Sequence, residues 1–247
     1  MRALLGLGLS LALIACGPGV SNASTAAPVT VKARDGITVF ARHYKTDKPK
    51  ALILLFHQAG SGKGEYATIA PRLNAAGYDA LAIDQRSGGE MFGENETALL
   101  VGKDPGYLAA QPDLQAAVDW AKTQKLPVII WGSSYSSSLV FPLAAANPGV
   151  VKAVLSFSPG EYFDDKSLIS KAAAKLAVPV FVTSAGDAEE VARAKPIFDA
   201  VPGAGKVFYQ PKEGGVHGSS TLIEKRNPKG AEANWTAVLA FLKSVTG

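Results

Sequence analysis

The chain has 247 residues, 47% of them hydrophobic, and this length and composition suit one large α/β domain better than two small ones. Its formal net charge is only +4 and its basic residues are scattered, so the charge gives little support to a nucleic-acid partner, and we expect none. We expect a monomer with one folded domain over residues 29–247.

The first 15 residues predict a secretory signal and not a part of the fold. Arg2 supplies a positive charge, and residues 3–15 form an apolar run that is too short to span a bilayer. The run ends in Leu13-Ile14-Ala15-Cys16, which resembles the lipobox of bacterial lipoproteins. The resemblance implies that Cys16, the only cysteine of the chain, is acylated and becomes the first residue of the mature protein. We therefore expect a lipid-anchored protein of the bacterial cell envelope, facing the periplasm or the cell surface.

The residue that follows the cysteine bears on which membrane would hold the lipoprotein. Gly17 stands there in place of Asp, which in a Gram-negative lipoprotein would point to the outer membrane. Residues 16–28 are mostly small and polar, and they predict a flexible tether between the lipid and the domain.

From residue 29 onward the pattern alternates strands and helices without an internal repeat. Asp35-Gly36 between residues 29–33 and 37–44 predicts an opening antiparallel hairpin. The apolar run 51–56 predicts a buried parallel strand. Further strands are expected over 79–83, 127–131, 151–157, 178–184 and 206–209, and helices over 65–76, 113–123, 134–147, 189–201 and 231–245. Repeated β-α units imply an α/β fold with a doubly wound, mostly parallel sheet, whose ligand chemistry lies at the carboxyl ends of the strands.

The most informative stretch is Val128-Ile129-Ile130-Trp131-Gly132-Ser133-Ser134-Tyr135-Ser136, in which a strand pattern runs directly into Gly-x-Ser-x-Ser. A serine on a sharp strand-to-helix turn is the nucleophile elbow, usually written G-x-S-x-G. The positions two before and two after the serine must be small; Gly132 meets this requirement fully and Ser136 only approximately. The elbow also places the serine beside a helix N-terminus, whose dipole favours developing negative charge. The sequence therefore predicts Ser134 as a nucleophile.

Two other interpretations of this stretch remain open. Residues 132–138 could be a polar loop with a helix cap, because serine-rich runs are common. Ser136 could be the nucleophile, because small residues flank it at the same spacing. The strand would then have to continue through Gly132 and Ser133, which are poor strand residues, so the Ser134 register is preferred.

A serine hydroxyl is a weak nucleophile at neutral pH and needs a base that is itself oriented. The chain has three histidines. His217 lies in a glycine-flanked loop between the last predicted strand and the last helix, which favours it as the base. His43 lies on the outward-facing side of the hairpin strand and is expected to be structural.

The acid should follow a strand between the serine and the histidine, since Ser, acid and then His is a known chain order of such triads. Asp187 follows the predicted strand 178–184 in a tight turn and precedes His217 by 30 residues (217 − 187). We expect it to be the acid, although it could be only a helix N-cap. The rival acids are Asp164, Asp165, Glu189 and Glu190.

An oxyanion intermediate needs two N–H donors. One should be the backbone amide of Tyr135, directly after the serine. The other should come from the loop that follows the strand 51–56, where Ala59 is slightly preferred over Gln58. His57 would then brace this loop.

Motifs for other chemistry are missing from the sequence. Gly60-Ser61-Gly62-Lys63-Gly64 looks like a phosphate loop, but it does not have the spacing G-x-x-x-x-G-K-[ST]. The chain also lacks the dinucleotide fingerprint G-x-G-x-x-G and the ligand spacing of a zinc site. We therefore expect neither a metal ion nor a cofactor.

Taken together, residues 30–245 resemble the α/β-hydrolase family, particularly its compact dienelactone-hydrolase-like branch. Besides the elbow, the matching stretches are Leu55-Phe56-His57-Gln58-Ala59-Gly60, Ile83-Asp84-Gln85-Arg86-Ser87-Gly88-Gly89, Gly186-Asp187 and His217-Gly218. The resemblance implies an α/β-hydrolase fold and a serine hydrolase that acts on esters, thioesters or, less often, amides. The chain departs from dienelactone hydrolases proper, which have a cysteine where Ser134 stands, and from the usual elbow at Ser136.

Three functions are compatible with these features. The leading one is a carboxylesterase that forms an acyl-enzyme on Ser134. A peptidase, amidase or thioesterase could use the same triad. A non-catalytic binding lipoprotein with a hydrolase fold is the third, and the intact Ser, Asp and His argue against it.

Two inserts bear on the substrate. Residues 86–112 and 158–177 are too short to form a large lid domain, so we expect small or no cap, small ester substrates and no interfacial activation. Their large apolar side chains are candidates for lining the substrate pocket, although such residues more often serve packing: Met91, Phe92, Tyr107, Tyr162 and Phe163.

Overall fold

A computed structural model describes residues 25–247. The expected signal peptide, Cys16 and the tether up to residue 24 lie outside the described residues. The first strand, β1 (Thr25–Lys32), begins four residues (29 − 25) before the expected start of the domain and takes in the end of the expected tether.

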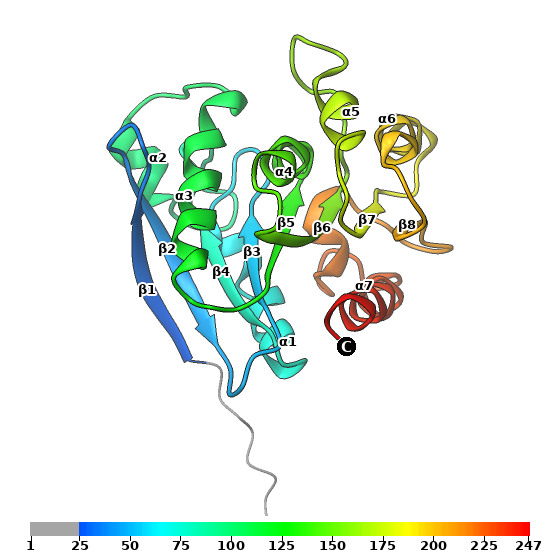
Figure 1. Ribbon diagram of the computed structural model, residues 1–247, viewed down its shortest axis with the longest axis horizontal. Helices are drawn as coiled ribbons and strands as arrows, with labels where there is room; N and C mark the ends of the chain where they lie inside the picture. The colour runs from blue at the N-terminus through cyan, green and yellow to red at the C-terminus, as the bar shows by residue number, and fades with distance from the viewer. Residues whose placement is uncertain (1–24) are drawn as a thin grey trace, which may run out of the picture.

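One eight-stranded sheet runs through the molecule in the order β1-β2-β4-β3-β5-β6-β7-β8 (Figure 1). Its other strands are β2 (Thr38–Lys45), β3 (Leu52–Phe56), β4 (Asp79–Ile83), β5 (Val128–Ser133), β6 (Val151–Phe157), β7 (Val180–Thr183) and β8 (Lys206–Tyr209). The β1–β2 and β2–β4 pairs are antiparallel and all others are parallel, which confirms the doubly wound, mostly parallel sheet. Two antiparallel steps separate β1 from β4, so β1 runs in the same direction as the parallel strands. The described chain therefore enters the sheet at the amino ends of those strands.

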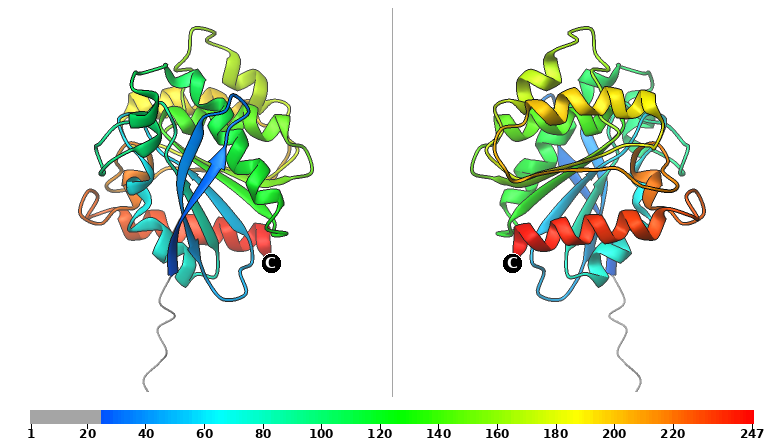
Figure 2. Two further views of the ribbon diagram at one scale, coloured as in Figure 1. Left: turned by 90° about the vertical axis from the view of Figure 1, so that its left-hand side faces the viewer. Right: turned by 90° about the vertical axis from the view of Figure 1, so that its right-hand side faces the viewer.

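The helices form two layers. The α-helices are α1 (Ile69–Ala75), α2 (Glu96–Val101), α3 (Gln111–Lys122), α4 (Tyr135–Ala146), α5 (Leu168–Ala173), α6 (Ala188–Ala200) and α7 (Ala231–Thr246), and the 3₁₀ turns are η1 (Lys63–Tyr66), η2 (Tyr107–Ala110) and η3 (Gly218–Leu222). Side chains of α3, α4, α5 and α6 pack on one face of the sheet, and those of α1 and α7 pack on the other. Figure 2 shows α6 and α7 on opposite sides of the strands.

The helix expected over 65–76 is divided into η1 and α1. The expected span would place Pro71 in a helix interior, where proline removes a hydrogen bond and clashes with the preceding turn. Because α1 begins at Ile69, Pro71 lies instead in its first turn, where the missing N–H costs nothing.

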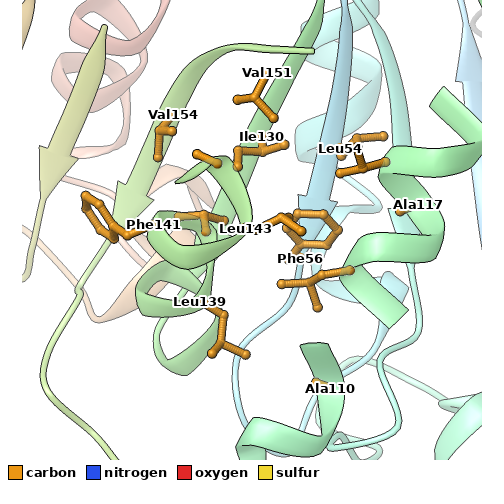
Figure 3. Packing of buried hydrophobic residues seen from close by; sticks show 14 of the residues in the cluster. Leu54, Phe56, Ala110, Ala117, Ile130, Leu139, Phe141, Leu143, Val151 and Val154 are labelled. Carbon is orange, nitrogen blue, oxygen red and sulfur yellow. The ribbon is translucent and has the colours of Figure 1, made fainter. Parts of the chain in front are cut away.

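The alternation of side chains along the buried strands builds both layers of the core. In β3, Leu54 and Phe56 face the α3–α4 layer, whereas Ile53 and Leu55 face the α1–α7 layer. Figure 3 shows Leu54 and Phe56 packed with the labelled side chains of α3 and α4. Full burial of one such side chain stabilises the fold by roughly 1.5–3 kcal/mol. The carboxyl ends of β3, β5 and β6 are thus held on a rigid support.

In the part of the chain that the structure describes, no helix combines the length and the apolar character that crossing a membrane requires.

Candidate active site

Ser134 sits at a sharp turn between β5 and α4, as the elbow motif predicts. Its backbone angles are φ 57° and ψ −124°, an unusual conformation for a residue with a side chain, and the serine is partly exposed. Gly132 makes the turn possible, because a Cβ there would lie 2.3 Å from the carbonyl oxygen of Ser136 and 2.5 Å from Cα of Ser137. The strained backbone presents the Ser134 hydroxyl at the N-terminus of α4.

Ser136 is placed quite differently. It is fully buried, its Oγ donates to the Phe56 carbonyl at 2.7 Å, and the Ser133 N–H donates to the same Oγ at 2.9 Å. The hydroxyl that replaces the usual glycine therefore ties the elbow to the end of β3. The alternative register, with Ser136 as the exposed serine, is wrong because that side chain points into the protein.

The loop after β8 brings His217 to the serine. Its Nε2 lies 2.7 Å from Ser134 Oγ, while its Nδ1 makes a short hydrogen bond with Glu190 Oε1. A neutral imidazole that accepts the serine proton at Nε2 carries its own proton at Nδ1 and donates it to the carboxylate. Ser134, His217 and Glu190 thus form one continuous chain of hydrogen bonds.

The acid at the histidine is Glu190, so the expectation that Asp187 lies there is wrong. Asp187 is exposed and caps α6, with its Oδ1 accepting the N–H of Glu190 at 2.9 Å. This N-cap role is the alternative that the sequence left open. The other rivals, Asp164, Asp165 and Glu189, are exposed.

A sequence signal for Glu190 exists in the spacing Asp187-x-x-Glu190. This is the capping-box pattern, in which the glutamate at the third helical position folds back over the helix N-terminus. Here the glutamate reaches back to the end of β7, where its Oε2 accepts the N–H of Ala185 at 3.0 Å and its Oε1 meets His217. Burial alone raises the pKa of Glu190, but the hydrogen bonds from His217 and Ser158 outweigh it and lower the pKa to about 2.

Ser158, which the sequence did not single out, supports the histidine loop. It follows β6 in a left-handed conformation with φ 61°, and its Oγ accepts the N–H of Gly218 at 3.0 Å. Its hydroxyl also bonds the Glu190 side chain. Ser158 therefore holds both partners of the His217–Glu190 pair.

The candidate N–H donors of the oxyanion hole differ in whether they already have a hydrogen-bond partner. The Gln58 N–H already donates to the carboxylate of Glu65 at 2.8 Å, so the Gln58 alternative is wrong. Ala59 is partly exposed beside it, and Tyr135 is the first residue of α4, whose N–H has no intrahelical partner. These two amides remain as the candidate donors.

His57 makes the bracing contacts expected of it. It is fully buried, its Nδ1 donates to the Gln58 carbonyl at 2.8 Å, and its Nε2 accepts the Gln85 N–H at 2.8 Å. Burial lowers the pKa of His57 to about 4, so the ring is neutral and links the loop after β3 to the loop after β4. His43 is also structural, but it is buried, not outward-facing, with its ring edge-on to Trp120 at 5.0 Å between centroids.

The expected pocket residues fall into two groups. Tyr107 stacks on Tyr135 at 4.6 Å between ring centroids, Tyr162 Oη donates to the Ser158 carbonyl at 2.8 Å, and the N–H of Met91 donates to Gly60. These three contact segments that also carry the candidate active site. Phe163 belongs to the buried core, and Phe92 packs under the guanidinium of Arg226, 4.3 Å from its ring centroid. Phe163 is therefore not a pocket residue.

Within residues 25–247, no three or more His, Cys, Asp or Glu side chains gather in a way that could hold a metal ion.

Residues 47–200 match the model of a family described as serine aminopeptidase, S33. The match includes Ser134 and Glu190 and ends before His217. A search of curated proteins finds no match for the chain.

Solved structures share the fold at low sequence identity. A dienelactone hydrolase from Anabaena variabilis is 17% identical with a TM-score of 0.71, over 91% of this chain and 99% of that one. An esterase from Pyrococcus furiosus is 17% identical with a TM-score of 0.65, over 91% of this chain and 94% of that one. A highly thermostable carboxyl esterase from Bacillus coagulans is 13% identical with a TM-score of 0.67, over 90% of this chain and 99% of that one. At such identities the likeness establishes the α/β-hydrolase fold.

Proposed function

Because the chain belongs to the serine aminopeptidase S33 family and is therefore an α/β-hydrolase, we propose that it is a carboxylesterase that cleaves small esters through an acyl-enzyme on Ser134. The single observation that carries this proposal is the hydrogen-bond chain from Ser134 Oγ through His217 to Glu190. A hydroxyl, an imidazole and a buried carboxylate in this order make up the machinery of acyl transfer.

In the proposed mechanism, Ser134 Oγ attacks the ester carbonyl while His217 Nε2 takes the hydroxyl proton. The resulting imidazolium is stabilised by Glu190, and the oxyanion is stabilised by the N–H groups of Ala59 and Tyr135. The bond to the leaving alkoxide then breaks, and His217 returns the proton to it, so that an alcohol departs. Water, deprotonated by His217, attacks the acyl-enzyme and releases the acid and the free serine.

The name of the family favours a second candidate, a peptidase. Both reactions need the same triad, and they differ in the leaving group, since an amine must be protonated as it leaves. We prefer the ester reading because the structural relatives that are named by activity are esterases and a dienelactone hydrolase.

We also propose that the protein is a lipoprotein of the cell envelope, held by a lipid on Cys16. The lipobox-like sequence Leu13-Ile14-Ala15-Cys16 supports this proposal. The small-molecule ester would then be the substrate of an envelope enzyme.

The test combines covalent labelling with two substrates. We expect a fluorophosphonate probe to label the wild type, and we expect hydrolysis of p-nitrophenyl acetate to exceed that of aminoacyl p-nitroanilides. Ser134→Ala should abolish labelling and lower kcat by roughly 10⁴-fold or more, with the thermal midpoint nearly unchanged. Faster cleavage of the anilides would establish the peptidase instead, and an unlabelled wild type would favour a binding protein.

The matched control is the neighbouring serine. Ser136→Ala removes two buried hydrogen bonds and should lower stability by roughly 1–3 kcal/mol, yet it should leave the labelling site in place. Loss of labelling in folded Ser136→Ala together with labelling of Ser134→Ala would overturn our assignment of the nucleophile.

A further inference from the structure

A buried carboxylate lies beneath the candidate active site and has no part in the mechanism above. Glu65, in η1, is 1% exposed. Its Oε2 accepts the Gln58 N–H at 2.8 Å and its Oε1 accepts the Ser133 hydroxyl at 2.7 Å. The Ser133 Oγ in turn accepts the N–H of Ser219 at 2.8 Å.

These three contacts reach the three segments that carry the proposed chemistry. Gln58 directly precedes Ala59, Ser133 directly precedes Ser134, and Ser219 follows His217 by two residues. One carboxylate therefore connects the candidate oxyanion donor, the nucleophile and the base, although these residues are far apart in the sequence.

A role in stabilising the fold alone does not explain why the buried residue 65 is a carboxylate. Taking a carboxylate out of water is costly, and an apolar or neutral side chain of similar shape fills a core at lower cost. Two of the active-site segments compensate Glu65 directly, through the Gln58 N–H and the Ser133 hydroxyl, and the third reaches it through the Ser219 N–H on Ser133 Oγ. Groups that reduce stability in this way are characteristic of functional sites.

We propose that Glu65 is a positioning residue, whose carboxylate holds Ala59, Ser134 and His217 in their working arrangement through Gln58, Ser133 and Ser219. The inference rests on the proposed hydrolase function and adds to it a residue that never touches the substrate. Because a misplacement of about 1 Å can cost about 100-fold in rate, loosening this anchor should lower kcat more than it raises KM.

The charge of Glu65 also makes the arrangement sensitive to pH. Burial raises the pKa of Glu65 to about 7, against the opposing effect of its bonds from Ser133 and Gln58. The titratable groups that sense its charge are His217 on the facing loop, Tyr66 on its own turn and Tyr135 at the start of α4. Burial raises the pKa of both tyrosines well above the usual range, so they stay neutral.

Protonation converts one Glu65 oxygen from an acceptor to a donor. If that proton bonds Ser133 Oγ, this hydroxyl accepts from both Glu65 and the Ser219 N–H and has to find a new acceptor for its own proton. We therefore expect the protonation of Glu65 to add one proton to those that inactivate the enzyme in acid.

The test is the pH profile of kcat/KM for p-nitrophenyl acetate in the wild type, Glu65→Gln and Ser133→Ala. In the wild type, the acidic limb of log(kcat/KM) should approach a slope of two. In Glu65→Gln the slope should be one, with kcat about 10- to 100-fold lower at the optimum and KM changed less than about threefold. Ser133→Ala should also lower kcat. The kcat of the double variant should be no lower than that of the less active single variant, since both changes disrupt the same contact between Glu65 and Ser133.

Asp79→Asn is the matched control. Asp79 is a buried carboxylate (5% exposed) at the first position of β4, at the opposite end of the parallel strands, where it accepts the N–H of Thr46. This variant should lose stability while keeping kcat and the slope of two. A Glu65→Gln variant that keeps a slope of two and a near-normal kcat, or multiplicative effects of Glu65→Gln and Ser133→Ala, would overturn the inference.

Two further outcomes are informative. If Glu65→Gln does not fold, Ser133→Ala carries the test: a kcat lowered by about 10-fold or more with KM changed less than about threefold supports the inference, and an unchanged kcat refutes it. An inactive wild type that no fluorophosphonate labels would instead refute the proposed function, so the two failures are distinguishable.

Discussion

At the residue scale, the Glu190 carboxylate stays ionised down to strongly acidic pH. Its pKa of about 2 in the folded protein lies below the ordinary glutamate value of 4.5. The folded state therefore binds fewer protons than the unfolded chain between these values. The stability that Glu190 contributes is fully present above about pH 4.5 and is lost as the pH falls toward 2.

Glu190→Gln and Asp187→Asn should separate the roles of the two acids. A glutamine at position 190 cannot stabilise the imidazolium of His217, so we expect kcat for p-nitrophenyl acetate to fall by roughly 10²- to 10⁴-fold. Asparagine is as good an N-cap as aspartate, so Asp187→Asn should stay within about threefold of the wild-type kcat and keep its thermal midpoint. Kinetics and thermal melts of the two variants check this. The reverse ranking of the two kcat values would restore Asp187 as the acid.

The acid beside His217 was the one member of the proposed triad that the sequence placed wrongly, and the reason is physical. Asp187 and Glu190 are three residues apart, and both suit the first turn of a helix. Which of them meets the histidine depends on how α6 leaves β7 and on where the loop after β8 places His217. Neither is a local property of the chain. Ser134 was predictable because the Gly132 requirement at the elbow is local, and the structure shows that requirement directly.

At the scale of elements, the inserts 86–112 and 158–177 contain too little helical structure to form a lid domain. Residues 86–112 contain the six-residue α2, the turn η2 and the first two residues of α3, and residues 158–177 contain the six-residue α5. Helices this short were not predictable, because the hydrophobic pattern needs more turns to become visible. The buried strands were predictable, because each is a continuous apolar run between turn residues.

The insert 86–112 exposes several apolar side chains. Large side chains of residues 86–112 are exposed, namely Met91 at 53%, Leu99 at 55%, Leu100 at 58%, Tyr107 at 40% and Leu108 at 44%. Of these, Met91 and Tyr107 contact segments that carry the candidate active site. No covering element that could open and close over that site is built from the two inserts.

A chain-length series of p-nitrophenyl esters tests this interpretation. From acetate to palmitate, we expect kcat/KM to be highest for short acyl chains, with no jump in rate when the substrate passes its solubility limit. A long acyl chain needs an extended apolar trough, and interfacial activation needs a mobile apolar lid. A maximum at long chains, or a sharp rise at the emulsion threshold, would indicate a lipase.

At the scale of the whole molecule, the membrane attachment that we propose depends on one residue. Acylation supplies about 0.8 kcal/mol for each CH₂ buried in the bilayer. In a Gram-negative host, Cys16→Ser should therefore move the protein from the membrane fraction to the soluble fraction. The measurement is fractionation followed by immunoblotting, with Ser134→Ala as a control that should stay in the membrane. A Cys16→Ser variant found in the membrane at the wild-type level would contradict the anchor.

The direction of β1 has a consequence for where such an enzyme would find its substrate. Thr25 begins β1 at the amino ends of the parallel strands, at the lower end of the sheet in Figure 1, whereas Ser134 follows β5 at their carboxyl ends. Only eight residues (17–24) lie between Cys16 and Thr25. A lipid on Cys16 would therefore draw the amino end of the sheet toward the bilayer and turn the opening of the site outward. Esters would reach Ser134 from the aqueous compartment, and the phospholipids of the membrane that holds the protein would lie behind it, beyond the far end of the sheet.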